Sequence, residues 1–182
     1  MFINSHIATG YIAGKISNEK TKFITIWCLA TVIPDVDGLW STTVVDHHSI
    51  LHTPIFWLLF CAAIYFIGIY FKNLQIKKTA FILLLGTLIH LFTDWLTART
   101  VGIKWLYPFN NTDYFLYQIQ PAKGDIPIIE MLIPPYIFFY FENKFLAYFE
   151  VGLSIFALGL FLRSFLEKKY NSIKKVDYKI NK

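Results

Sequence analysis

The sequence predicts an all-α membrane protein, a multi-pass bundle of about five helices with one further broken or re-entrant segment. Of its 182 residues, 55% are hydrophobic and 16% are charged, whereas soluble domains usually carry about a quarter charged residues. The hydrophobic residues occur in long runs, and the mean hydropathy is +0.48. The length suits one membrane-embedded domain over residues 1–166, followed by a basic tail over residues 167–182.

Three apolar segments are long enough to cross a bilayer as helices, which takes roughly 17–25 residues. These segments are Pro54–Phe71, Thr79–Thr97 and Phe145–Leu166. Two shorter apolar segments precede them, Phe2–Ile16 and Phe23–Pro34. Each of the shorter segments is expected to form a helix that packs within the bundle.

The basic residues predict how these helices are oriented. Of 17 Lys and Arg residues, 13 fall in three clusters, Lys15–Lys22, Lys72–Lys78 and Arg163–Lys182. If the five segments alternate in direction, all three clusters lie on one face, and that face is cytoplasmic by the positive-inside rule. The net charge of +5 is thus explained by membrane orientation, and the bilayer rather than a nucleic acid is the expected partner.

A sixth apolar segment, Ile126–Phe141, is interrupted by Pro134-Pro135 and contains Glu130. Proline lacks an amide donor and disfavours a helical residue before it, so the segment is expected to break near its middle. A full crossing here would place the basic tail outside, against the charge bias. The segment is therefore predicted to enter and leave on the lysine-poor face, where it covers the histidines described next.

All histidines fall at the lysine-poor ends of their segments in this arrangement. They are His6, His47, His48, His52 and His90. Four of the first five carboxylates lie at the same ends, namely Asp35, Asp37, Asp46 and Asp94. Each residue alone is readily explained by packing, by a turn or, for Asp46, by a helix cap. A random scatter over two faces would rarely bring them all to one, and this convergence indicates a shared site.

The spacing of these residues favours a metal site. His90 and Asp94 are four residues apart in an otherwise apolar helix, which places both side chains on one face. A carboxylate in a membrane helix is unfavourable by a few kcal/mol at the bilayer centre and usually marks function. Asp35 and Asp37 are alternate residues of a Pro-Asp-Val-Asp-Gly turn. Mixed imidazole and carboxylate ligands are typical of a divalent metal, most often zinc.

Four motifs in series resemble the YdjM-type family, whose members are called inner-membrane metal-dependent hydrolases. The motifs are Ser5-His6-Ile7-Ala8-Thr9-Gly10, Ile33-Pro34-Asp35-Val36-Asp37, His47–Thr53 and His90–Thr97, followed by Gly102 and Pro108-Phe109. That family is similar in turn to the zinc-dependent phospholipase C and single-strand nuclease group. The resemblance implies an inner-membrane location, with His47 and Asp37 in the site. It also implies a set of metal ligands: His6, Asp35, His52, His90 and Asp94.

One motif departs from the family pattern, which usually reads His-Arg-Gly-x-Thr-His. Here the stretch is His47-His48-Ser49-Ile50-Leu51-His52, so that His48 replaces the arginine and Leu51 the threonine. If that arginine binds a substrate phosphate in the family, Arg99 or Lys104 would have to replace it.

The function that these features predict is a membrane-bound metal-dependent hydrolase acting on phosphoester bonds of lipid headgroups. Asp37 is a candidate base or second-metal ligand, and His47 or His48 a candidate acid. A divalent-cation transporter is one alternative, although Pro54–Phe71 and Phe145–Leu166 carry few polar side chains and no repeat is visible. Haem bound by two histidines would leave the aspartates unexplained. A metal-binding membrane protein without catalysis is a further alternative, and the oligomeric state stays open.

Overall fold

The chain is described here by a computed structural model that covers residues 1–98, 101–116, 126–127, 130 and 133–180. All regular elements of this described part are helical, and the predicted all-α fold is confirmed. The long helices are α1 (Ile3–Ile16), α2 (Thr21–Ala30), α4 (Pro54–Tyr70), α5 (Leu74–Thr97) and α7 (Lys144–Ile180). The short ones are η1 (Ile33–Leu39), α3 (Val44–His47), η2 (Ile50–His52), η5 (Tyr136–Phe138) and α6 (Phe139–Glu142).

Two helices are longer than their apolar segments. α5 begins at Leu74 rather than at Thr79, because the side chain of Asn73 accepts hydrogen bonds from Gln75 N at 2.9 Å and Ile76 N at 3.2 Å. This N-cap starts the helix before the apolar residues begin. α7 continues past Leu166 through the basic tail to Ile180, since neither glycine nor proline interrupts it there.

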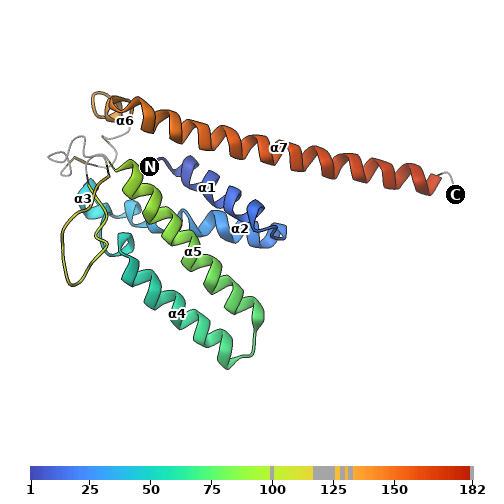
Figure 1. Ribbon diagram of the computed structural model, residues 1–182, viewed down its shortest axis with the longest axis horizontal. Coiled ribbons are helices and arrows are strands. Elements are labelled where there is room, and N and C mark those ends of the chain that lie inside the picture. Colours follow the sequence, from blue (N-terminus) through green and yellow to red (C-terminus); the bar gives the residue numbers. More distant parts are fainter. Residues whose placement is uncertain (99–100, 117–125, 128–129, 131–132, 181–182) are drawn as a thin grey trace.

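The helices pack in a chain of neighbours. α4 and α5 form an antiparallel pair, α2 lies between α1 and α5, and α7 runs along α1 (Figure 1). Small residues permit the closest approaches. A Cβ atom added at Gly10 of α1 would lie 2.7 Å from the carbonyl oxygen of Trp27, and one at Gly86 of α5 would lie 2.4 Å from Cβ of Ala30. These contacts hold α1, α2 and α5 together at the end where the histidines lie.

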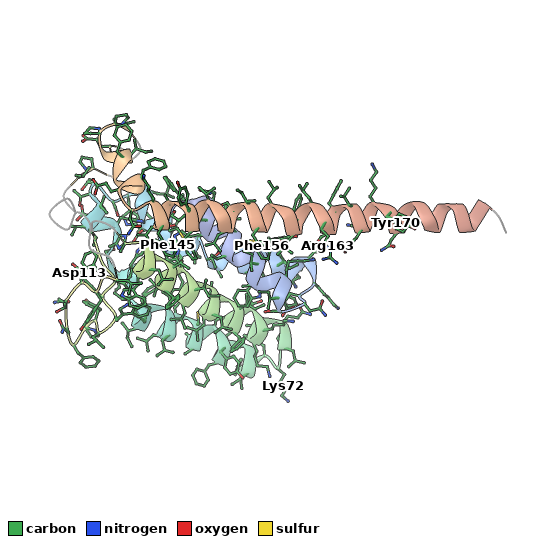
Figure 2. The ribbon with its side chains drawn as sticks, turned by 45° about the horizontal axis from the view of Figure 1, so that its top comes forward. Lys72, Asp113, Phe145, Phe156, Arg163 and Tyr170 are labelled. Atoms are coloured by element: carbon green, nitrogen blue, oxygen red, sulfur yellow. The ribbon has the colours of Figure 1, made fainter. Side chains whose placement is uncertain are left out.

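Among the residues that the structure describes, two helices are long and apolar enough to cross a membrane, namely α5 and the first 28 residues of α7, Lys144–Asn171. α2 and α4 are shorter apolar helices. Apolar side chains project outward along α7, among them Phe145 and Phe156 (Figure 2). An apolar surface of this extent is typical of contact with lipid rather than with water.

The segment Ile126–Phe141 is broken as predicted, in the part of it that the structure describes. Val44 N donates to Ile126 O at 3.1 Å, which ties the start of the segment to α3. Its other end forms the short helices η5 and α6. Residues 128–129 and 131–132 lie outside the described part of the chain. The predicted return of the segment to its face of entry stays a prediction.

Candidate metal site

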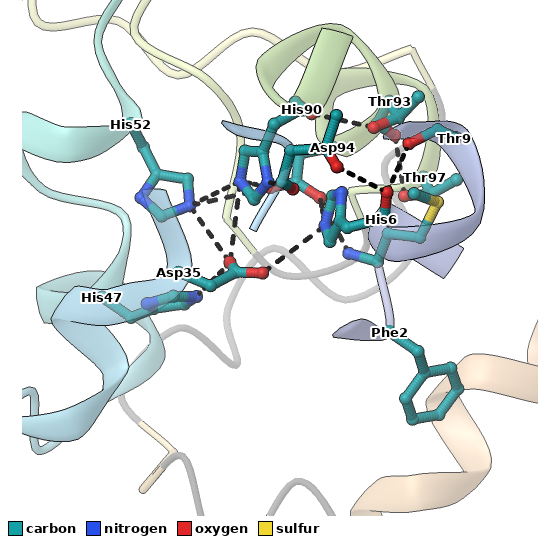
Figure 3. A network of polar contacts seen from close by, with 12 residues as sticks. Phe2, His6, Thr9, Asp35, His47, His52, His90, Thr93, Asp94 and Thr97 are labelled. Atoms are coloured by element: carbon teal, nitrogen blue, oxygen red, sulfur yellow. Dashed lines mark hydrogen bonds and ion pairs between the residues drawn. The ribbon is translucent and has the colours of Figure 1, made fainter. Parts of the chain in front are cut away.

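The sequence-predicted site residues come from five elements. Figure 3 shows His6, Asp35, His47, His52, His90 and Asp94 gathered together. His6 lies in the second turn of α1, and His90 and Asp94 lie in the last two turns of α5. The short helix η1, which begins beside Pro34, supplies Asp35 and Asp37. The remaining histidines belong to α3, to its C-terminal cap and to η2, and they are His47, His48 and His52.

Four of these side chains form a group that could hold a metal ion, called here the buried group: His6, Asp35, His90 and Asp94. His6 Nε2 lies 3.0 Å from Asp94 Oδ1 and 3.7 Å from Asp35 Oδ2. His90 Nε2 lies 2.9 Å from Asp94 Oδ2 and 3.6 Å from Asp35 Oδ1. Both histidines are fully buried. Each carboxylate therefore offers one oxygen to His90 and the other to His6.

His52 lies against one side of this group. Its Nε2 atom lies 3.2 Å from His90 Nε2 and 3.6 Å from both Asp35 Oδ1 and Asp94 Oδ2. Such separations are close to those between two ligand atoms that each lie about 2 Å from one zinc ion. The spacing of these side chains thus fits a divalent cation.

Hydrogen bonds fix which nitrogen of His90 is free. His90 Nδ1 lies 2.9 Å from the carbonyl oxygen of Thr31, which can only accept, so Nδ1 carries the hydrogen. In the neutral ring Nε2 then has the lone pair that a metal requires. Metal-ligating histidines usually bond a carbonyl or carboxylate in this way. The hydroxyl of Thr31 also donates to His6 O at 2.8 Å. Thr31 therefore bonds both α1, through His6, and α5, through His90.

Asp37 holds the Nδ1 hydrogen of His47, as the carbonyl oxygen of Thr31 holds that of His90. Its carboxylate is fully buried, and Oδ1 accepts from His47 Nδ1 at 2.6 Å. The opposite ring nitrogen of His47 lies 3.2 Å from Asp35 Oδ1. Asp37 Oδ2 lies 3.4 Å from His52 Nδ1. Asp37 is thus placed to orient the imidazole of His47 toward the buried group.

Several buried polar atoms of the site are not hydrogen-bonded. Of six buried side-chain atoms without a hydrogen-bond partner in the described part of the chain, five belong to the site: His6 Nδ1, His6 Nε2, Asp35 Oδ2, Asp37 Oδ2 and His52 Nδ1. The α-ammonium of Met1 also lies here, 2.9 Å from Asp94 Oδ1. Such unsatisfied buried atoms are rare and usually indicate a missing ion or water.

The charges of the site shift the pKa values of Asp35 and His47 in opposite directions. Burial would raise the pKa of Asp35, but the nearby His90, His47 and His52 lower it below its usual range. Burial would lower the pKa of His47, but hydrogen bonds to Asp35 and Asp37 and their negative charges raise it to about 9. The carboxylates are therefore charged at neutral pH and attract a proton or a cation.

Other residues named from the sequence fall outside the cluster. Asp46 forms a capping box with Thr43, since its carboxylate lies 3.3 Å from Thr43 N and its own N–H bonds the Thr43 hydroxyl. Asp46 is thus the third residue of α3 and bonds back to the N-cap Thr43, rather than capping a helix that follows it. Lys104 is half-buried, and Arg99 lies outside the described residues. The His6 and His90 rings stack with centroids 3.9 Å apart, which leaves no room for a haem between them.

One residue of the site region was missed from the sequence. Glu150 of α7 is a buried carboxylate, and its Oε2 accepts from Phe2 N, at the start of α1, at 3.0 Å. Ser5 Oγ also bonds Glu150 O at 3.3 Å. Both contacts lie within four residues of His6. The signal was present, because Glu150 is a lone carboxylate in an apolar helix, as Asp94 is.

Glu150→Ala is expected to lower the free energy of unfolding by about 1–3 kcal/mol, because it removes the buried carboxylate that accepts from the partly buried Phe2 N–H. It should also weaken metal binding, since α1 carries His6. Glu150→Gln retains an acceptor oxygen, so its loss of stability and of metal affinity should be smaller. Thermal unfolding and zinc titration in detergent measure both effects. Glu167→Ala, at an exposed position of the same helix, is the control, and an equal loss there would refute a specific role.

Comparison with known protein families gives a match over most of the chain. The family model described as YdjM inner membrane protein matches residues 1–168. No curated protein and no solved structure gives a match. The likeness to phospholipase C therefore stays a prediction.

Proposed function

Because the chain belongs to the YdjM inner membrane protein family and gathers buried histidines and aspartates into one group, we propose that it is a membrane-bound metal-dependent hydrolase. The observation that carries the proposal is the buried group, in which one ligand atom each of His6, Asp35, His90 and Asp94 lie within 4.8 Å of one another around a common centre. When bound, a divalent cation supplies Lewis-acid chemistry and acidifies water to a pKa of about 7.

The proposed ligands are those at this centre and on its His6 side: His6, Asp35, His52, His90 and Asp94. Zinc is the proposed cation, because zinc accepts imidazole and carboxylate ligands in a tetrahedral set. Thr31 and Asp37 support the site by holding the Nδ1 hydrogens of His90 and His47. Loss of such supporting bonds typically weakens metal binding 10- to 100-fold.

The side of the site next to α3 is proposed to face the substrate. His47 is more accessible than the buried histidines, with a side-chain exposure of 18% against 0% for His6. A group that protonates a leaving group has to reach the substrate, so His47 or His48 is proposed for this role. Asp37 would then hold His47 in place and act as a positioning residue.

The proposed substrate is a phosphoester in a lipid headgroup. The family is a membrane family, and the histidines gather at one end of α5, a helix long enough to span. An apolar cavity of about 570 Å³ lies beside η2 and the start of α4, lined in part by Ile50, Phe56 and Tyr107. A cavity of this size and composition can take part of an apolar ligand.

Hydrolysis can be tested with purified protein in detergent, first with a chromogenic phosphodiester and then with phospholipid vesicles. Zinc-loaded wild type should release product, and a chelator should stop it. Asp94→Ala should reduce turnover at least 100-fold, because the group loses a ligand. Zinc binding without turnover on any phosphoester would leave a metal-binding membrane protein without catalysis.

We further propose that the basic clusters face the cytoplasm and the site faces outward. Lys78 Nζ lies 2.7 Å from Glu19, and Lys22 Nζ donates to Gln75 at 3.0 Å, so the α1–α2 and α4–α5 connections lie together. Lys72 and Arg163 lie toward the end away from Asp113 (Figure 2). Lys and Arg loops stay cytoplasmic.

Cysteine labelling in sealed cells tests this orientation, in a variant that lacks Cys28 and Cys61. Asn143→Cys, between α6 and α7, should react with a membrane-impermeant maleimide. Asn171→Cys, at the end of the apolar part of α7, should react only after lysis. Labelling of Asn171→Cys in intact cells would reverse the proposed orientation. Protection of Asn143→Cys together with labelling of Asn171→Cys is also the pattern expected if the segment before α7 crosses the membrane, whereas protection of both positions would mean that α7 does not cross.

A further inference from the structure

Three imidazoles form a second set of ligand atoms beside the buried group. This three-histidine group consists of His47, His48 and His52, and one ring nitrogen of each lies within 4.8 Å of the others. The His48 and His52 rings stack with centroids 4.6 Å apart, and the His47 ring lies edge-on to His52 at 4.7 Å. The N–H donors of His47 and His48 bond groups outside these three rings, so they do not satisfy the lone pairs within the group.

Hydrogen bonds already settle which nitrogen two of these rings present. His47 Nδ1 donates to Asp37 Oδ1 at 2.6 Å, and His48 Nδ1 lies 3.3 Å from the carbonyl oxygen of Gly102. Both acceptors can only accept, so Nδ1 carries the hydrogen in each ring, and Nε2 is the nitrogen whose lone pair a cation would take, in place of a proton in the case of His47. This is the state in which imidazole binds a metal.

Asp35 lies between the two groups and contacts both. Its Oδ1 atom is 3.2 Å from His47 Nε2 and 3.6 Å from His52 Nε2. Oδ1 also lies 3.6 Å from His90 Nε2, whereas Oδ2 faces the other way, 3.7 Å from His6 Nε2. A carboxylate whose two oxygens face opposite sides can bridge two cations, as in two-metal sites with cations about 3.5–4 Å apart.

We propose that the three-histidine group binds a second divalent cation that shares Asp35 with the first. The first cation rests on the proposed function; the second rests on His47, His48 and His52. His52 then serves the outer cation, and the buried group keeps its other four ligands. Three imidazoles with one open position are the ligand set of catalytic zinc, and this outer position is the more accessible one.

The proposal changes the part played by two residues. An imidazole that binds a cation through Nε2, with its Nδ1 hydrogen held by Asp37 or Gly102, has no proton to give to a leaving group. His47 and His48 would therefore be ligands rather than acids. His48 is also where this chain departs from the arginine usual in the YdjM-type pattern, so His48→Arg restores a residue that the motif accommodates.

Metal content after gel filtration in detergent tests the proposal, with elemental analysis and calorimetric titration as readouts. Wild type should bind about two zinc ions per chain and His48→Arg about one. Asp46→Asn, next to His47 but in the capping box, is the matched control and should keep both. A chelator should remove the outer ion first. His48→Ala, with helicity checked by circular dichroism, guards against misfolding of the arginine variant.

The outcomes separate this proposal from the proposed function. Equal zinc content in wild type, His48→Arg and His48→Ala overturns the second site. One ion that is lost in Asp94→Asn but kept in both His48 variants leaves only the buried cation. One ion that is lost in the His48 variants but kept in Asp94→Asn retains the three-histidine site and removes the other. Absence of zinc from folded wild type overturns both.

Discussion

Asp94→Asn is expected to remove most of the stabilisation that zinc gives to the folded protein. Binding to the folded state alone stabilises by about 2.7 kcal/mol at 100 times Kd. For a chain of this size such stabilisation raises Tm by about 5–11 °C. Asp94 is buried and contacts three site histidines, at 2.9 Å to His90, 3.0 Å to His6 and 3.6 Å to His52. The side-chain amide of asparagine has nearly the same shape as the aspartate carboxylate but carries no charge.

Thermal unfolding in detergent over a series of zinc concentrations measures this effect. The comparison is the zinc-dependent change in Tm within each variant, because Asp94→Asn also alters the metal-free protein. Asp113→Asn, at an exposed carboxylate, should respond to zinc as wild type does. A small shift can persist in Asp94→Asn if the three-histidine group binds its own cation. An undiminished shift would show that zinc stabilises the protein from elsewhere.

Apolar run length predicted the long helices well, because burial in lipid or protein selects for it directly. α4 begins at Pro54 and ends within one residue of its predicted end. α5 and α7 extend beyond their apolar runs into polar residues, so run length underestimated both helices. The start of α5 depends on the Asn73 cap, and α7 continues because no glycine or proline follows Leu166. The short helix η1 was predicted only as a turn. Its shape depends on contacts that the sequence does not display.

For the site, the sequence predicted which residues come together but not how they are held. Helical spacing pairs His90 with Asp94, and the motifs in series select the other members. Support from main-chain carbonyl groups was beyond prediction, because any residue has one: Thr31 O fixes His90 and Gly102 O fixes His48. Glu150 could have been found by the argument that singled out Asp94.

Gly10→Ala is expected to weaken zinc binding although Gly10 touches no ligand side chain. A Cβ atom there would lie 2.4 Å from Thr31 Oγ1, 2.7 Å from Trp27 O and 2.8 Å from Cys28 Cα. Two of these are backbone atoms that cannot rotate away, so α1 would have to move from α2. Overpacking of this kind typically costs about 1–3 kcal/mol.

The same displacement acts on the metal site through Thr31. Its hydroxyl bonds His6 O, and its carbonyl holds the Nδ1 hydrogen of His90, so a shift at Gly10 disturbs both ligands. Zinc affinity should fall about 10-fold or more, as for other supporting contacts. Gly159→Ala on α7 is the matched control, since nothing lies within 4 Å of its added Cβ. Calorimetric titration of both variants should show loss only in Gly10→Ala. Unchanged affinity there, with lowered stability, would mean that the α1–α2 contact supports the fold without setting the geometry of the site.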